Sequence, residues 1–295
     1  MKAAQVRAGA GEVAIEEVER REPGPGQVRV AVEAAAVNPV DVMVSSGVFW
    51  DPSWTVVGNG WDFAGRVDAV GDGVDDLKEG DLVAGIDTDL PSATRAQAEY
   101  VVADRPAVAA IPAGLTVQQT ASVPLNALTA MQALTLLGEP SGRRLLITGA
   151  AGAVGGYALA LAADAGWKVI GLARAGDEEF VRATGADEFV TSLDGAAYDA
   201  VLDAAALQEK ALAAVSNGGD FVGVLPASVP ATERGIETQA VQVAADQSQL
   251  KRALELSASG RLQPRIAGTF PLSEAGTAYD KVAAGGNRGR WLLLP

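Results

Sequence analysis

The sequence predicts an α/β protein in which a parallel, nucleotide-binding sheet is inserted into a β-rich domain. The chain opens with short alternating strands and dense turns, continues with alanine-rich helices between short apolar strands, and returns to strand–helix–strand at its end. A tail that rejoins the first domain makes the middle an insertion. We therefore assign residues 1–117 and 265–295 to the β-rich domain, and residues 118–264 to the nucleotide-binding domain.

The first domain is identified by its strand and turn patterns. Val28–Glu33 and Gly65–Val70 alternate apolar and polar residues as half-buried strands do. Glycine, proline and aspartate mark turns at 23–26, 71–73 and 79–81. Many short strands separated by such turns indicate a barrel-like or rolled β domain.

A glycine-rich turn in the middle of the chain indicates a dinucleotide site. Leu145–Thr148 forms an apolar strand, a helix is expected over about 153–165, and Lys168–Ala173 forms a second strand. Three glycines lie in or border the turn between the first strand and the helix: Gly149, Gly152 and Gly155. In a Rossmann βαβ unit such glycines let the backbone approach a pyrophosphate, and the helix N-terminus offers it free N–H groups. We expect the backbone of Ala153 and Val154 to complete this contact.

The end of the second strand predicts which nicotinamide cofactor binds. An acidic residue there is typical of NAD sites, because it bonds the ribose 2′-hydroxyl, whereas an arginine suits the 2′-phosphate of NADP. The strand ends in Leu172-Ala173-Arg174, and no carboxylate precedes Asp177. The sequence thus predicts NADPH, with Arg174 on its phosphate; the alternative is a solvated loop arginine.

Composition narrows the possible chemistry. The 295 residues contain neither cysteine nor histidine. This excludes Ser-His-Asp and Cys-His nucleophiles, thiolate and imidazole metal ligands, and disulfides. We expect no metal site, and any catalysis must depend on a cofactor.

Charge and hydropathy exclude two classes of partner. The net charge of −14 and the pI near 4.5 disfavour nucleic acid and anionic membranes. No apolar run approaches the roughly 20 residues that span a bilayer, and the first residues lack the apolar core of a signal peptide. We expect a cytoplasmic protein without nucleic-acid or membrane partners.

A set of short motifs extends along nearly the whole chain. Besides the glycine turn, they are Val37–Val42 (Val-Asn-Pro-Val-Asp-Val), Gly60–Gly65, Val70–Val74, Glu79–Val83, Ala98–Val102, Val123–Ala130, Gly185–Asp187, Asp199–Asp203 and Gly289–Leu292. In their order, more than in any one motif, they resemble the medium-chain dehydrogenase/reductase superfamily, in its zinc-independent quinone oxidoreductase branch. The resemblance implies a Rossmann domain inserted in a GroES-like catalytic domain, NADPH as cofactor, a quinone or α,β-unsaturated carbonyl as hydride acceptor, and a homodimer. Zinc-dependent relatives carry Cys and His where this chain has Asn38 and Trp61.

The remaining candidate residues are expected around a cleft between the two domains. Asn38 is assigned to the nicotinamide ribose or a substrate carbonyl, against the alternative of a turn asparagine before proline. Asp41, Trp50, Trp54 and Trp61 are assigned to the substrate pocket, where the tryptophans form an apolar wall; packing within the β domain is the alternative. The further cofactor contacts are Thr129, Leu225 and Arg290.

The sequence leaves more than one candidate for the proton donor and more than one class of function. Tyr100, the single tyrosine of residues 1–117, is a candidate acid beside Asn38, but quinones and enones accept hydride without one, because water protonates the product. A Thr-Gly-x-x-Gly-x-x-Gly turn also fits short-chain dehydrogenases, but those use a Tyr-x-x-x-Lys pair, which this chain lacks. Two alternative functions are an enoyl-thioester reductase of a biosynthetic pathway and a non-catalytic NADPH-binding sensor or structural protein.

Overall fold

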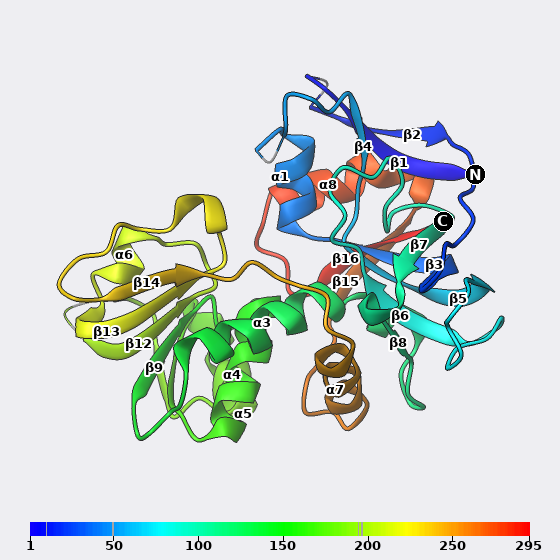
Figure 1. Ribbon diagram of the computed structural model, residues 1–295. Helices are drawn as coiled ribbons and strands as arrows, with labels where there is room; N and C mark the ends of the chain where they lie inside the picture. Colours follow the sequence, from blue (N-terminus) through cyan, green and yellow to red (C-terminus); the bar gives the residue numbers. More distant parts are fainter. Residues whose placement is uncertain (10, 49, 194, 196) are drawn as a thin grey trace. The chain divides into compact units, whose positions relative to one another are not determined.

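The computed structural model describes residues 1–9, 11–48, 50–193, 195 and 197–295 (Figure 1). The chain divides into two compact units, one made of Met1–Leu125 with Ala244–Pro295 and the other of Asn126–Val243. The nucleotide-binding part is therefore an insertion, as the sequence predicts. The units meet at 125/126 and 243/244 along the chain, whereas the sequence analysis placed the boundaries at 117/118 and 264/265.

The first unit contains two sheets. One sheet has the strand order β15-β16-β3-β5-β6-β8, with β7 also paired to β3, and the other has the order β2-β1-β4. The strands are β1 (Lys2–Arg7), β2 (Val13–Glu17), β3 (Gln27–Val37), β4 (Val56–Gly58), β5 (Asp62–Val70), β6 (Leu82–Ile86), β7 (Tyr100–Asp104), β8 (Val108–Ala110), β15 (Ile266–Pro271) and β16 (Arg290–Leu294). The helices are α1 (Pro39–Ser45), α2 (Val117–Ala121), α7 (Gln247–Ala258) and α8 (Ala275–Ala283).

The alternating segments of the sequence form the core of this unit. Val28, Val30 and Val32 point inward from β3 and pack with Phe63 of β5 and Val83 of β6. The intervening residue Arg29 is held by Asp68 at 2.5 Å and Glu22 at 2.6 Å, which explains why a charge is tolerated in the strand. Apolar burial on one face therefore fixes the register in which β3 pairs with β5.

The end of the chain returns to the first unit through β16. This strand pairs antiparallel with β3, placing Trp291 opposite Val37 and Leu293 opposite Ala35. The strand–helix–strand pattern predicted for the end of the chain is thus confirmed, and its last strand brings Arg290 close to the end of β3.

The second unit is a parallel sheet in the order β11-β10-β9-β12-β13-β14. Its strands are β9 (Arg144–Thr148), β10 (Lys168–Leu172), β11 (Glu188–Val190), β12 (Tyr198–Asp203), β13 (Val215–Gly223) and β14 (Glu237–Ala240). Its helices are α4 (Ala153–Ala165), α5 (Glu178–Thr184) and α6 (Glu209–Leu212), and α3 (Pro124–Leu137) leads into it from the first unit. The predicted helix over 153–165 coincides with α4.

One expectation about this part of the chain needs correction. The helix α7 lies within residues 118–264, which the sequence analysis assigned to the nucleotide-binding domain, but it belongs to the first unit, where it packs on β8. At one side of the sheet β14 is the edge strand, since β13 pairs with both β12 and β14. The homodimer stays a prediction.

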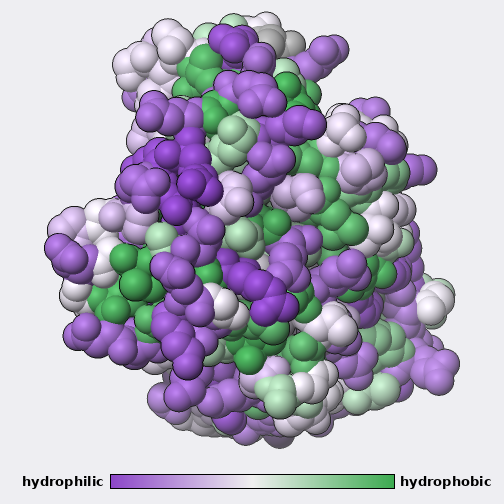
Figure 2. Space-filling view, turned by 90° about the vertical axis from the view of Figure 1, so that its right-hand side faces the viewer, coloured by the Kyte–Doolittle hydropathy of each residue, from purple (hydrophilic) through white to green (hydrophobic). Residues whose placement is uncertain are grey.

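The surface in the view of Figure 2 mixes polar and apolar side chains. Figure 2 shows hydrophilic and hydrophobic residues interspersed on the face that it draws. Among the described residues, the large hydrophobic side chains that are exposed are Val48, Val70 and Leu136. No helix within the described ranges has the length and apolarity that crossing a bilayer demands.

Candidate functional site

The glycine turn of the second unit has the geometry of a phosphate cradle. Gly149 follows β9 with a φ of +58°, and Gly152 is the N-cap of α4. A Cβ on Gly155 would lie 2.2 Å from the carbonyl oxygen of Gly149, and one on Gly152 would lie 3.0 Å from the same atom. Gly155 therefore has no space for a side chain, the left-handed φ of Gly149 favours glycine, and Gly152 has a tight contact, so the helix begins close to the strand end.

The first turn of α4 is accessible to a ligand. Gly152 is exposed, and Ala153 and Val154 are half-buried. The N–H groups of a helix N-terminus lack partners within the helix and favour anions. The residues present therefore fit the pyrophosphate of a dinucleotide.

A buried hydrogen-bond network fixes the strand ends beside this turn. The Thr148 hydroxyl donates to Asp203 Oδ1 at 2.6 Å and accepts from the Ala205 backbone N at 2.9 Å. Asp203 Oδ2 in turn accepts from the Gln208 backbone N at 2.7 Å. The turn after β12 is thereby held next to the turn after β9, and a Cβ on Gly149 would lie 3.2 Å from that of Ala205.

Arg174 lies at the same edge of the sheet as the glycine turn. It directly follows Ala173 at the end of β10, which pairs with β9, and its side chain is exposed. Among the described residues its guanidinium has no hydrogen-bond or ion-pair partner. A cation held at the carboxyl edge of the sheet and not engaged by a carboxylate suits a phosphate.

The other predicted cofactor residues are distributed over both units. Leu225 is half-buried just after β13, at the carboxyl edge of the sheet. Thr129 is a buried residue of α3, with 8% of its surface exposed. Arg290 lies in β16 of the first unit, where burial raises the pKa of Asp41 and Asp62 and the charge of Arg290 opposes that rise.

The first unit contains a buried polar cluster centred on Asn38. Its backbone N donates to Asp41 Oδ2 at 2.7 Å, and its Nδ2 donates to Asp62 Oδ2 at 2.8 Å. Asn38 follows β3 and precedes α1, while Asp62 begins β5, which pairs with β3. The antiparallel register, with Ala35 opposite Phe63, brings the two side chains together.

Two residues from distant parts of the sequence extend this cluster. The Tyr279 hydroxyl donates to Gln97 Oε1 at 2.6 Å, and Gln97 Nε2 donates to the Ala36 carbonyl at 3.0 Å. The same Nε2 lies 3.4 Å from Asp41 Oδ2. Asp41 Oδ1 is buried without a hydrogen-bond partner among the described residues.

Burial raises the pKa of both carboxyls that contact Asn38. The pKa of Asp41 rises from 3.8 to about 7 because the group is removed from water, although its bond from Asn38 and the charge of Arg95 oppose the shift. The pKa of Asp62 rises to about 6 for the same reason, against its bonds from Leu125 and Asn38. Both groups therefore titrate near neutral pH.

Trp61 lies apart from the other candidate tryptophans. Its indole stacks on the guanidinium of Arg95, at 4.9 Å from ring centroid to Cζ, and Arg95 is fully buried. Trp50 and Trp54 instead meet edge to face at 6.1 Å and pack against the Val6–Val44–Val57 cluster. The three candidate tryptophans thus divide between two environments, and Phe49, the neighbour of Trp50, lies outside the described residues.

Tyr100 and Asn38 are not brought together. Tyr100 pairs with Ala31 in β3, and Asn38 follows Ala31 by seven residues. At ~3.3 Å per residue this is roughly 20 Å along the strand. The Tyr100 ring is instead covered by the guanidinium of Arg20, at 5.1 Å.

Sequence reasoning missed four members of the buried cluster: Asp62, Arg95, Gln97 and Tyr279. A carboxylate directly after Trp61 and directly before the apolar residues Phe63 and Ala64 was the available signal for Asp62. No signal joined Gln97 to Tyr279, because 182 positions separate them.

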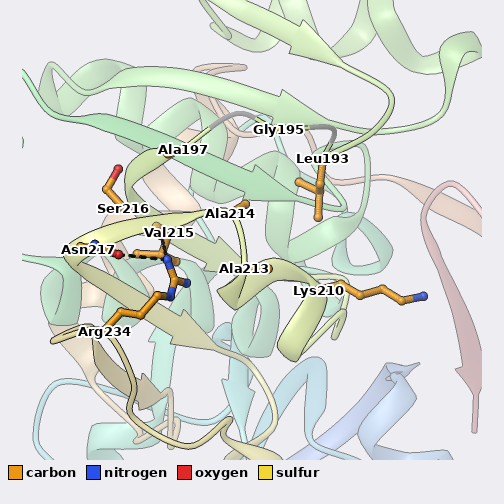
Figure 3. Close-up of a pocket in the computed structure, with 10 residues that line it drawn as sticks. All are labelled: Leu193, Gly195, Ala197, Lys210, Ala213, Ala214, Val215, Ser216, Asn217 and Arg234. Atoms are coloured by element: carbon orange, nitrogen blue, oxygen red, sulfur yellow. Dashed lines mark hydrogen bonds between the residues drawn. The ribbon is translucent and has the colours of Figure 1, made fainter.

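A cavity of about 560 Å³ lies at the opposite edge of the nucleotide sheet (Figure 3). Ala197 and Val215, at the amino ends of β12 and β13, contribute to its wall, and Lys210 projects from its rim. The Arg234 guanidinium there already donates to the carbonyls of Val215 and Leu212, each at 2.8 Å. The cavity is therefore separate from the glycine turn, which follows the carboxyl end of β9.

The described residues include no group of histidine, cysteine or carboxylate side chains arranged to hold a metal ion.

Comparisons with known proteins match both units. A family described as "Alcohol dehydrogenase GroES-like domain" matches residues 24–133, and one described as "Zinc-binding dehydrogenase" matches residues 175–293. The "NADPH-dependent alkenal/one oxidoreductase, chloroplastic" of Arabidopsis thaliana is 31% identical over 287 residues, covering 91% of this chain and 72% of that protein.

Other relatives differ widely in length. "Pikromycin polyketide synthase component PikAII" of Streptomyces venezuelae is 36% identical over 273 residues, covering 86% of this chain, but the chain spans only 7% of that protein. Among solved structures, the quinone oxidoreductase from Coxiella burnetii superimposes with a TM-score of 0.89 at 26% identity, covering 100% of this chain and 99% of the other.

Proposed function

Because the chain belongs to the medium-chain dehydrogenase/reductase superfamily, among quinone oxidoreductases and enoyl reductases, we propose that it is an NADPH-dependent, metal-independent reductase of quinones or α,β-unsaturated carbonyls. Oxidoreductases of this fold bind a nicotinamide cofactor. The observation that supports the cofactor most directly is the glycine turn, whose backbone packing leaves no space for a Cβ at Gly155. When bound, the cofactor supplies the hydride.

The proposed choice of NADPH rests on Arg174. Its exposed guanidinium lies after β10 without a partner among the described residues, and the first carboxylate of the following segment is Asp177. Charge-assisted bonds to a 2′-phosphate favour NADPH, whereas a ribose 2′-hydroxyl gains little from a cation.

The proposed acceptor class rests on which residues are available to polarise it. The chain has no histidine and no cysteine, so the ligands of a catalytic zinc are missing. Asn38 is proposed to bind the nicotinamide ribose or the acceptor carbonyl. Quinones and enones yield delocalised anions that water protonates, whereas the alkoxide of a simple ketone requires a metal or a positioned acid.

A steady-state comparison of acceptor classes tests this function. We expect NADPH oxidation with ortho- or para-quinones or with enones, and little turnover of saturated ketones. Asn38→Ala is expected to lower kcat/KM, and Trp54→Ala tests whether that tryptophan lines the pocket. Efficient reduction of saturated ketones, but not of quinones or enones, would contradict the proposed mechanism. NADPH binding without turnover of any acceptor would favour the non-catalytic alternative.

A second candidate is reduction of an enoyl thioester. The 36% identity to PikAII favours it, although the chain spans a small part of that protein. Enoyl thioesters belong in the same panel of acceptors. A kcat/KM for a thioester well above that for any free quinone or enone would select this alternative.

A further inference from the structure

Asp62 is a fully buried carboxylate that joins two separate segments of the first unit. Its Oδ2 accepts from Asn38 Nδ2 at 2.8 Å, and its Oδ1 accepts from the backbone N of Leu125 at 2.6 Å. Leu125 is the second residue of α3, and Pro124 before it has no N–H. Asp62 therefore satisfies one of the first free donors of that helix.

We propose that Asp62 is a positioning residue, which fixes the carboxamide of Asn38 and, with its other oxygen, the first turn of α3. The inference rests on the proposed function in one respect, namely that Asn38 contacts the acceptor or the nicotinamide ribose. The carboxylate of Asp41 accepts a hydrogen bond from the backbone N of Asn38, and the carboxylate of Asp62 accepts one from the side-chain Nδ2 of Asn38. The two carboxylates together restrict both parts of the residue.

The two hydrogen bonds explain why a carboxylate is needed at this position. A carboxylate has two acceptor oxygens, whereas an amide has one oxygen and an NH2 donor. Asp62→Asn can therefore satisfy Asn38 or Leu125, but not both. Both donors are buried, so the one that loses its acceptor has no water to replace it. A carboxylate at a helix N-terminus is also electrostatically favourable.

A double-mutant cycle tests whether Asp62 acts through Asn38. Asp62→Asn is expected to lower kcat/KM for the best acceptor roughly tenfold, the effect of losing one hydrogen bond to a charged group. In an Asn38→Ala background, the same change is expected to have little further effect, because its target is gone. Full additivity of the two substitutions would overturn the positioning role. Asp246→Asn is the matched control, since Asp246 caps α7 by accepting from Gln249 N, and asparagine caps equally well.

A second readout needs neither cofactor nor turnover. The side-chain NH2 resonances of Asn38, identified by their loss in Asn38→Ala, are expected to be protected from exchange in the wild type and to become like those of free amides in Asp62→Ala, which removes both acceptor oxygens. Unchanged resonances would overturn the inference. If Asn38→Ala leaves kcat/KM unaltered, the substrate placement in the proposed function is wrong, and these resonances still decide whether Asp62 fixes the carboxamide.

The wild type supplies a further measurement if Asp62→Asn does not fold. Burial raises the pKa of Asp62 to about 6. The charged groups that interact electrostatically with its carboxyl are Arg290, which opposes the rise, and Asp41. The Asn38 amide resonances are expected to shift with pH near that value. Exchange of these wild-type amide protons as fast as in a free amide, at any pH from 5 to 8, would overturn the inference.

Discussion

Thr148 and Asp203 join the carboxyl ends of two neighbouring parallel strands by a buried hydrogen bond of 2.6 Å. Thr148 is the last residue of β9, so the bond is made at the residue that directly precedes Gly149 and the glycine turn. It fixes the turn after β12 against Gly149, so the shape of the cradle depends on a side chain from each strand.

Thr148→Val removes this bond at nearly constant volume. The fully buried Asp203 carboxylate then loses its hydroxyl donor, which is expected to cost about 1–3 kcal/mol of unfolding free energy, whereas water can replace the acceptor of the exposed Ala205 N–H. Thr148→Ser keeps the hydroxyl and serves as the control. Urea denaturation of the three proteins measures the effect, and equal stability of the valine and serine variants would contradict the assigned role.

Gly155→Ala is expected to disturb the phosphate cradle. Its Cβ would lie 2.2 Å from a backbone oxygen, and overpacking of this kind costs about 1–3 kcal/mol. The variant is therefore expected to unfold at lower temperature and to bind NADPH more weakly. Gly276→Ala, in α8 with open space around it, is the matched control and is expected to stabilise slightly. Fluorescence titration with NADPH and thermal unfolding distinguish the two.

Arg174→Ala is expected to reduce the preference for NADPH over NADH. Loss of a charge-assisted contact costs about 1.5–3 kcal/mol, which is roughly a ten- to hundredfold change in dissociation constant. NADH affinity is expected to change little, because NADH lacks the 2′-phosphate. Arg252→Ala, which removes another exposed arginine without a partner among the described residues, controls for net charge. Equal affinity of the wild type for both cofactors would refute the assignment.

The buried acids predict an unusual dependence of stability on pH. The pKa of Asp41 is raised to about 7, and those of Asp62 and Asp87 to about 6. The folded protein binds these protons more tightly than the unfolded chain does. The folding stability that these three groups contribute through the protons they bind is therefore fully present below about pH 4, and it is lost as the pH rises to about 7.

Asp41→Asn tests this dependence with little change of shape. Its amide oxygen can still accept from Asn38, and the buried charge is gone, so the variant is expected to be more stable than the wild type at pH 8 and less sensitive to pH. Asp246, whose pKa is lowered by its bonds from Ser248 and Gln249, contributes stability in the opposite direction and is the contrast. Chemical denaturation at pH 5, 6, 7 and 8 provides the measurement; an unchanged slope in Asp41→Asn would contradict the prediction.

The sequence by itself determined the elements that depend on neighbouring residues. The glycine turn, α4 and the closing strand appear where the sequence places them, because strand period, helix start and glycine conformation are local properties. The insertion of one domain in the other also followed from the change of pattern along the chain. The absence of histidine and cysteine limited the chemistry before any fold was considered.

Only the tertiary structure decided which side chains meet. In the tertiary structure α7 belongs to the first unit, and Tyr100 lies far along β3 from Asn38. Trp50 and Trp54 pack together, whereas Trp61 lies in a different environment. It also joined Asn38 to Asp62 and Gln97 to Tyr279 through strand register and helix packing. The residues in these contacts are far apart in the sequence. Which buried polar groups become hydrogen-bond partners is decided by how the apolar residues around them pack, and local sequence patterns do not predict that packing.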